Sequence, residues 1–231
     1  LGEQPDTVFV SGAPALDYLA TFHATSFEDL KKNLNMNLTD SPIVVTYHPE
    51  TIHFSKNESN LREIVNALAS VSRPVIFTGS NADTTGRRMN AIIDEATKNN
   101  PNFFFKNNLG TDGYYNLLSH SFAMLGNSSS GIIEAMSFKL PVINLGDRQR
   151  GRVQGSNVIN TTCSSFDILK AIEQISNKDF LDKIMANENP YFSGGASDCI
   201  VDVLAKYPVE KVKKIKEFRD MKKLFERISD G

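Results

Sequence analysis

Short apolar runs alternate along the chain with longer segments in which apolar residues recur at helical spacing. The short runs predict strands, and the longer segments predict helices. The expected strands lie at 7–10, 43–46, 75–77, 103–105, 123–125, 142–145 and 158–159. The expected helices lie at 14–19, 27–34, 61–68, 89–96, around 117–118, and at 132–136, 166–175, 180–185, 197–205 and 209–228.

Strands that are apolar on both sides and alternate with helices predict an α/β fold with a Rossmann-like parallel sheet and helices on both faces. Right-handed crossovers bring every strand-to-helix loop to the carboxyl edge of the sheet, where open sheets of this kind bind ligands. We expect residues 40–206 to form this domain. Residues 1–39 are expected to be an inter-domain segment or the tail of a preceding domain, and 207–231 a charged C-terminal helix.

Composition and charge exclude several classes of function. The formal net charge is −2, so the chain has no basic field to hold nucleic acid or an anionic membrane. The two cysteines, Cys163 and Cys199, lack CxxC spacing, which argues against a zinc site and fits a reducing, cytoplasmic location. No metal-binding spacing of acidic residues is visible, and no apolar run approaches the length of a membrane span. The chain begins with Leu1 rather than Met, so we expect it to be part of a longer protein.

A serine-rich turn follows the expected strand at 123–125. Its sequence, Gly126-Asn127-Ser128-Ser129-Ser130-Gly131, precedes a predicted helix, where free N–H groups and hydroxyls suit a phosphate. The glycine spacing echoes a P-loop, but Ile132 and Ile133 replace the Lys and Ser or Thr of that motif. A plain helix cap is the alternative, since Ser and Asn are favoured cap residues. Glu134 is favoured by the helix dipole in either case, and it can also accept hydrogen bonds from ribose hydroxyls.

Three other loops carry candidate side chains, each directly after a predicted strand. His48 precedes Pro49, and a histidine at this edge can bind a phosphate or move a proton near neutral pH. Asn81 is a candidate contact to a base, ribose or sugar. Arg148 lies in the arginine-rich segment 146–152, which suits an anionic substrate. The alternatives are an incidental histidine and a solvated charged loop.

These motifs, taken in order, resemble one known family. His-Pro follows one strand, Asn-Ala-Asp the next, Gly-Asn-Ser-Ser-Ser-Gly-Ile-Ile-Glu a later one, and Pro-Val-Ile-Asn-Leu-Gly-Asp-Arg-Gln-Arg-Gly-Arg comes last. This set is similar to the carboxyl-terminal domain of the hydrolysing UDP-N-acetylglucosamine 2-epimerases of the sialic-acid pathway. A closely similar branch acts on UDP-2,4-diacetamido sugars. The resemblance runs from about residue 10 to about residue 204, and Phe192 departs from the family's late glycine-rich segment.

The resemblance implies one half of a two-domain, glycosyltransferase-B-type fold with the active site between two Rossmann-like halves. The family reaction eliminates UDP from UDP-N-acetylglucosamine to give a glycal, and then adds water to release N-acetylmannosamine. The acid–base carboxylates come mostly from the amino-terminal domain, so we expect this chain to be inactive alone. The implied partners are UDP and a UDP-N-acetylhexosamine, with no metal or other cofactor. A homodimer or homotetramer is expected for the full-length enzyme.

The resemblance also assigns roles to individual residues. Ser128, Ser129 and the backbone of Gly131 would hold the diphosphate of UDP, and Glu134 would hold the ribose hydroxyls. The catalytic candidate is His48, at the diphosphate or the reacting sugar. Arg148 would reach the phosphate or stabilise a closed loop, while Asn81 would line the nucleotide pocket.

Two other classes of function stay open at this point. The first is the donor-binding domain of a UDP-sugar glycosyltransferase with the same architecture, although the segment Asp-Arg-Gln-Arg-Gly-Arg at 147–152 speaks against it. The second is a non-catalytic nucleotide-binding or assembly module.

Overall fold

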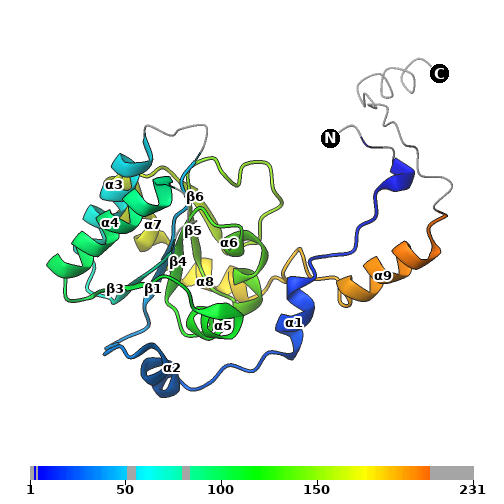
Figure 1. Cartoon of the computed structure of the whole chain (residues 1–231), viewed down its shortest axis with the longest axis horizontal. Coiled ribbons are helices and arrows are strands. Elements are labelled where there is room, and N and C mark those ends of the chain that lie inside the picture. Colours follow the sequence, from blue (N-terminus) through cyan, green and yellow to red (C-terminus); the bar gives the residue numbers. More distant parts are fainter. Residues whose placement is uncertain (1–2, 4, 51–55, 80–83, 209–231) are drawn as a thin grey trace, which may run out of the picture. The chain divides into compact units, whose positions relative to one another are not determined.

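The structure is a computed structural model that describes residues 3, 5–50, 56–79 and 84–208 (Figure 1). The chain divides into two compact units, Leu19–Tyr191 and the combination of Leu1–Tyr18 with Phe192–Gly231. The first unit is the sheet domain. It begins earlier than the predicted boundary at residue 40, because helix α2 (Phe27–Leu34) packs Leu30 and Leu34 into the core of the sheet domain.

Six parallel strands form the sheet, in the order β3-β2-β1-β4-β5-β6. The strands are β1 (Ile43–Thr46), β2 (Val75–Thr78), β3 (Phe103–Lys106), β4 (Ala123–Gly126), β5 (Val142–Leu145) and β6 (Val158–Thr161). Every one of them coincides with an apolar run from which a strand was predicted. The predicted α/β class with a Rossmann-like parallel sheet is therefore confirmed.

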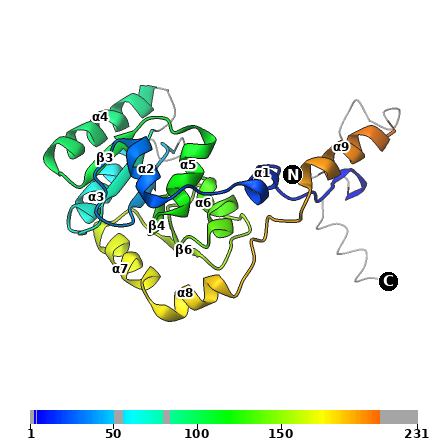
Figure 2. The same cartoon turned by 90° about the horizontal axis from the view of Figure 1, so that it is seen from below.

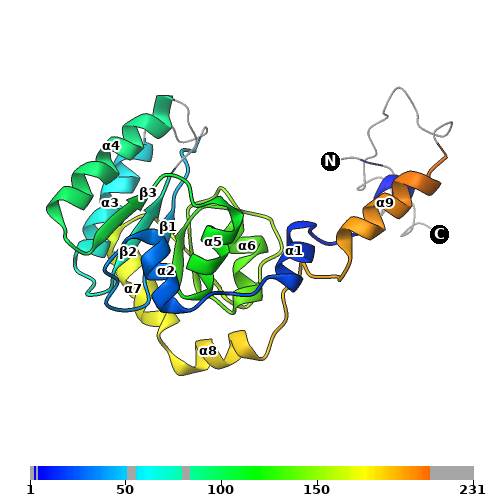
Figure 3. The ribbon, with the colours of Figure 1, turned by 60° about the horizontal axis from the view of Figure 1, so that its bottom comes forward.

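Helices cover both faces of the sheet, because successive strand side chains point to opposite faces. Ile43 and Val45 of β1 pack with α3 (Asn57–Ala69), α4 (Thr84–Asn99) and α7 (Ser165–Ile175). Val44 faces the other way, toward α2, α5 (Gly110–Ser119) and the short helices α6 (Ser130–Ile133) and η3 (Ala135–Phe138). Figure 3 shows α3 and α4 on one side of the strands and α5 and α6 on the other, and Figure 2 shows α2 beside α5.

Helix caps follow the local sequence. The hydroxyl of Ser26 accepts a hydrogen bond from the backbone N–H of Asp29 and so begins α2. The same arrangement begins α7 at Ser164 and α8 (Lys178–Met185) at Asn177. Among the described residues, no helix is long and apolar enough to span a membrane.

The predicted strand at 7–10 is wrong. A single 3-10 turn, η1 (Pro5–Thr7), occupies its start, and Val10 is 94% exposed. High β-propensity yields a strand only where a neighbouring strand supplies hydrogen bonds and packing, and no described strand lies beside this segment. The helix predicted at 209–228 lies outside the described residues.

In the second unit, α1 (Ala15–Thr21, which extends into the sheet domain) and α9 (Ala196–Lys206) are joined by one carboxylate. Asp17 accepts hydrogen bonds from the backbone N–H groups of Ala196 (2.9 Å) and Ser197 (2.7 Å) at the start of α9. These bonds, those of Ser197 above all, lower the pKa of Asp17 below its ordinary value. Asp17 therefore serves as the missing N-cap of α9, whose own cap position holds Gly195.

Candidate nucleotide site

The strand order reverses between β1 and β4, since the chain runs outward to β3 on one side and to β6 on the other. Open parallel sheets bind ligands outside the carboxyl ends of the strands at such a switch point. The loops that meet there begin at Tyr47 and at Asn127. Two of the predicted motifs, His48-Pro49 and the serine-rich turn, are therefore neighbours.

Gly126 allows these two loops to approach each other. Its φ is +141°, and a Cβ added there would lie 2.0 Å from the carbonyl oxygen of Thr46. The next residue, Asn127, donates its backbone N–H to the same carbonyl at 3.2 Å. Because only glycine fits this contact, the close junction of β1 and β4 explains the first glycine of the turn.

Asn127 connects the loops after β1, β4 and β5 by hydrogen bonds, a role that was not predicted for it. Its side-chain Oδ1 accepts the backbone N–H of His48 at 2.7 Å, and its Nδ2 donates to the carbonyl of His48 at 2.9 Å. The Asn127 carbonyl accepts hydrogen bonds from Arg148 Nη1 (3.0 Å) and Gln149 Nε2 (2.7 Å). The structure thus brings His48 and Arg148 to one place. The only sign of this role in the sequence is the position of Asn127 directly after a predicted strand.

The surroundings of His48 favour the neutral form of its imidazole. Burial lowers its pKa below the ordinary value of 6.5, and the positive charge of Arg148 lowers it further. Its Nδ1 is buried and has no hydrogen-bond partner among the described residues. A neutral imidazole beside a guanidinium can accept a proton or donate a hydrogen bond to an anionic ligand.

The serines of the turn differ from an ordinary helix cap. Ser129 occupies the N-cap position of α6, yet its side chain makes no capping hydrogen bond. Ser128 Oγ accepts only a long bond, 3.3 Å, from the backbone N–H of Ser130. The hydroxyl of Ser129 is therefore not used in capping and that of Ser128 makes one long bond, which weakens the plain-cap interpretation.

Gly131 has a structural reason to be glycine. A Cβ added there would lie 3.0 Å from Cγ1 of Val142 on β5, so its absence lets α6 pack closely on the sheet. The predicted contact between its backbone and a diphosphate stays a prediction.

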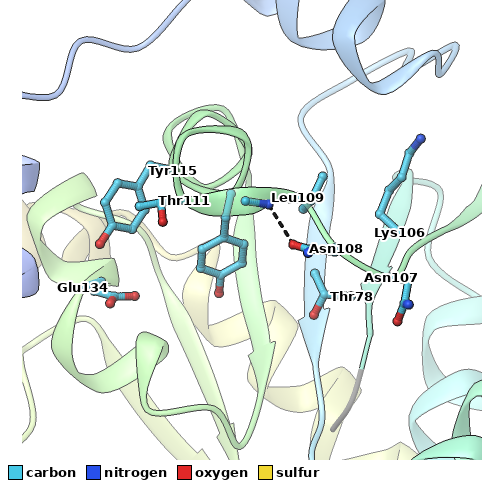
Figure 4. A pocket seen from close by; sticks show the side chains of 10 residues that line it. Thr78, Lys106, Asn107, Asn108, Leu109, Thr111, Tyr115 and Glu134 are labelled. Carbon is cyan, nitrogen blue, oxygen red and sulfur yellow. Dashed lines mark hydrogen bonds between the residues drawn. The ribbon is translucent and has the colours of Figure 1, made fainter. Parts of the chain in front are cut away.

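A pocket of about 410 Å³ lies beside Glu134, at the carboxyl ends of β2 and β3 and against α5. Figure 4 shows Glu134 and Tyr115 on one side of it, with Lys106 and Asn107 on the other. Other polar groups that line it belong to Thr78, Asn108, Thr111 and Tyr114. The residues at 106–115 that line this pocket were not predicted as site residues, because they come from a loop and a helix without a recognisable motif.

The carboxylate of Glu134 is oriented by two hydroxyls. Tyr114 donates to Ser130 Oγ at 3.0 Å, and Ser130 donates in turn to Glu134 Oε2 at 2.5 Å. Burial raises the pKa of the Tyr114 phenol, which keeps it a hydrogen-bond donor. The hydroxyl of Ser130 thereby holds one oxygen of Glu134 in place. The carboxylate lines the pocket, where it can accept hydrogen bonds from a hydroxylated ligand.

The other predicted cations and ligands lie differently. Arg148, Arg150 and Arg152 are all exposed. Arg150 forms an ion pair with Asp147 at 3.9 Å, whereas Arg148 donates a hydrogen bond to the carbonyl of Asn127 in the turn. Asn81 lies outside the described residues. Within residues 3, 5–50, 56–79 and 84–208, no three His, Cys, Asp or Glu side chains group as metal ligands.

A Rossmann-like sheet with a hydroxyl-rich turn at its switch point is an arrangement typical of nucleotide-binding domains. A family model described as UDP-N-acetylglucosamine 2-epimerase matches residues 1–205, so the chain belongs to the UDP-N-acetylglucosamine 2-epimerase family. It is 35% identical over 182 residues to the GDP/UDP-N,N'-diacetylbacillosamine 2-epimerase (hydrolyzing) of Campylobacter jejuni. That match covers 78% of this chain and 47% of the relative. It is 30% identical over 223 residues to the polysialic acid biosynthesis protein P7 of Escherichia coli, covering 96% and 56%.

Solved structures give the same fold. The S. aureus MnaA–UDP co-structure superposes with a TM-score of 0.70 at 17% identity, covering 95% of this chain and 58% of that one. The Methanocaldococcus jannaschii UDP-GlcNAc 2-epimerase in complex with UDP-GlcNAc and UDP gives 0.66 at 20% identity, covering 88% and 56%. The predicted glycosyltransferase-B-type architecture is confirmed. The chain spans about half the length of these relatives.

Proposed function

We propose that this chain is the UDP-binding half of a hydrolysing UDP-N-acetylglucosamine 2-epimerase and is inactive without a second domain. The observation that supports the proposal is that the two ends of the segment Gly126–Glu134 contact groups of opposite charge. Its first part, at Asn127, meets a cation and a neutral histidine, and its last part meets an oriented carboxylate. A nucleoside diphosphate has the same division, with an anionic diphosphate at one end and ribose hydroxyls at the other.

The proposed placement of UDP follows from this match. Glu134 accepts hydrogen bonds from the ribose hydroxyls, and the base enters the pocket between α5 and the end of β3. The hydroxyls of Ser128 and Ser129 and the guanidinium of Arg148 bind the diphosphate. Asn81 would complete the nucleotide pocket, and the backbone of Gly131 would contribute to the phosphate site.

In the proposed reaction the bond between the sugar C1 and the UDP oxygen breaks, while a base removes the proton from C2. The departing UDP gains negative charge, which Arg148 and the serine hydroxyls stabilise more strongly than they stabilise the bound substrate. Neutral His48 donates a hydrogen bond to the leaving group or moves a proton at the reacting sugar. The carboxylates that act on the sugar carbons would come from the second domain.

A 2,4-diacetamido sugar is the second candidate for the substrate. The relatives from Campylobacter jejuni and Legionella pneumophila are both named as hydrolysing diacetylbacillosamine 2-epimerases, at 35% and 29% identity. The alternative substrate differs at C4 of the sugar, remote from the nucleotide contacts described above. The nucleotide site is therefore expected to serve either substrate.

Titration calorimetry with UDP tests the proposal on this chain. UDP is expected to bind, and Glu134→Ala is expected to weaken it, whereas Glu173→Ala, an acidic change on α7, is the control. The full-length enzyme is then given UDP-N-acetylglucosamine or a UDP-2,4-diacetamido sugar. Release of UDP and a free 2-epimerised sugar supports the hydrolysing reaction and identifies the substrate. An epimerised product still attached to UDP, or turnover that requires an acceptor, contradicts it.

A further inference from the structure

Two buried asparagines hold the segment His48-Pro49-Glu50 in the same way. The side chain of Asn127 bonds both backbone polar groups of His48, at 2.7 and 2.9 Å. The side chain of Asn57, at the start of α3, bonds both backbone polar groups of Glu50, at 2.8 and 3.0 Å. Pro49 between them has no N–H to satisfy. Every backbone hydrogen-bonding group of residues 48 and 50 is therefore paired by an asparagine.

The two asparagines differ in the other residues to which they are bonded. Asn57 is 1% exposed and joins Glu50 to its own helix. Asn127 is 0% exposed, and its carbonyl is the acceptor for Arg148 and Gln149 from the loop after β5. Its Nδ2 also lies 3.5 Å from Glu50 Oε1. Asn127 is thus the point at which the β1, β4 and β5 loops are fixed to one another.

Full burial decides the role that Asn127 can have. With no accessible surface it cannot touch a ligand, so any effect on binding must pass through the groups that it holds. Those groups are the backbone of His48 and the guanidinium of Arg148. Removing the side chain also leaves a partly buried N–H and a partly buried carbonyl of His48 without these partners, which allows the loop to move.

We propose that Asn127 is a positioning residue, which fixes the backbone of His48 and the guanidinium of Arg148 at the switch point before a ligand binds. The proposal extends the proposed function, because it takes these two side chains as the groups that receive the diphosphate. Asn57 performs the same structural task two residues further along the loop, at Glu50, without a link to Arg148.

Asn127→Ala and Asn57→Ala form a matched pair, since each removes one buried amide with two bonds to the β1–α3 loop. UDP titration, urea unfolding and the NMR titration of the His48 ring, assigned with His48→Gln, are measured on both. Arg148 and Glu50 are the charged residues that contact Asn127, which also bonds the His48 backbone. Asn127→Ser repeats the test with a smaller loss of polarity if the alanine variant does not fold.

Asn127→Ala is expected to weaken UDP binding about 10-fold, the equivalent of one lost pair of positioned hydrogen bonds. The His48 pKa should rise toward 6.5 as its burial and its proximity to Arg148 decrease. Asn57→Ala should cost similar stability with His48 and UDP binding little changed. Equal effects of the two variants on His48, or no effect of Asn127→Ala on it, would overturn the proposal. Because the His48 titration needs no UDP, failure of UDP binding in the unmodified chain would contradict the proposed function alone.

Discussion

Different kinds of hydrogen bond hold the two ends of the segment Gly126–Glu134 in place. Near Asn127 the hydrogen bonds involve backbone groups. The side-chain amide of Asn127 bonds the main chain of His48, and the main-chain carbonyl of Asn127 accepts a bond from Arg148. Near Glu134 the hydrogen bonds join side chains, since the hydroxyl of Tyr114 donates to Ser130 and the hydroxyl of Ser130 donates to the carboxylate. The first arrangement presents a cation and a neutral ring, and the second presents an anion.

The difference indicates how each end tolerates change. Hydrogen bonds to backbone depend on where loops run, so the Asn127 end depends on the close junction of β1 and β4. Hydroxyl relays depend on single atoms, so the Glu134 end should respond to the removal of one oxygen while the fold stays intact. The predictions below separate the two ends, beginning with the largest effect.

Gly126→Ala should disrupt the Asn127 end and much of the domain. The new Cβ would lie 2.0 Å from a backbone oxygen at a positive φ, so we expect a loss of about 3 kcal/mol or more in the free energy of unfolding. Urea unfolding measures it. Gly151→Ala is the control, because its φ is also positive but nothing lies within 4 Å, and it should lose only about 1 kcal/mol. Equal losses would show that the steric contact is unimportant.

Glu134→Ala should act on binding rather than on folding. A hydrogen bond to a charged group contributes about 1.5–3 kcal/mol, so UDP affinity should fall roughly 10- to 100-fold. Stability should change little, since the carboxylate borders a pocket. Calorimetry with UDP and with UMP distinguishes the roles, because a ribose contact weakens both ligands alike. Loss for UDP but not UMP would move Glu134 away from the ribose.

Tyr114→Phe should have a smaller effect in the same direction. It removes the donor to Ser130 and keeps the ring, so the carboxylate of Glu134 loses its support but not its charge. A loss of about 1 kcal/mol, or several-fold in UDP affinity, is expected. Combining it with Glu134→Ala provides a double-mutant cycle, and the two effects should not add. Additive losses would mean that Tyr114 acts independently of Glu134.

His48 should give the smallest effect, a pH dependence of stability. Its folded pKa lies below the unfolded value of 6.5, so the unfolded chain binds the proton first as the pH falls. The stability from the neutral ring is complete above about pH 6.5 and is lost progressively below it. His48→Asn should therefore lose less stability than the unmodified chain between about pH 7.5 and pH 5.5. Parallel pH profiles would contradict this assignment.

Much of the fold could be predicted, because buried parallel strands have a strong local signature. Each of the six runs from Ile43 to Thr161 forms a strand, whereas the run at 7–10 has the same composition and lacks a partner strand. Long-range pairing, which no local pattern encodes, decides between them. The same limit applies to the site. His48 and Arg148 stood out as residue types in loops after strands, but their connection through Asn127 depends on strand order.

Tyr114 illustrates the remaining gap. An aromatic residue within a helical segment is expected to pack against the core, and Tyr114 is partly buried there. Its hydroxyl becomes part of the site only because α5 lies over the end of β4, where Ser130 begins α6. Such contacts depend on how helices pack across a sheet and have no signature in sequence spacing.

The carboxylate of Asp17 has a consequence for the order of folding. It caps a helix whose first residue lies 179 positions later in the chain, so the two can meet only after the whole sheet domain has been synthesised. During synthesis the sheet domain can fold first, because the contacts between its neighbouring strands are closer in sequence. The docking of α9 onto α1 is then a late step with a large loop to close. A destabilised sheet domain should delay it, whereas Asp17→Ala should leave the earlier steps unchanged.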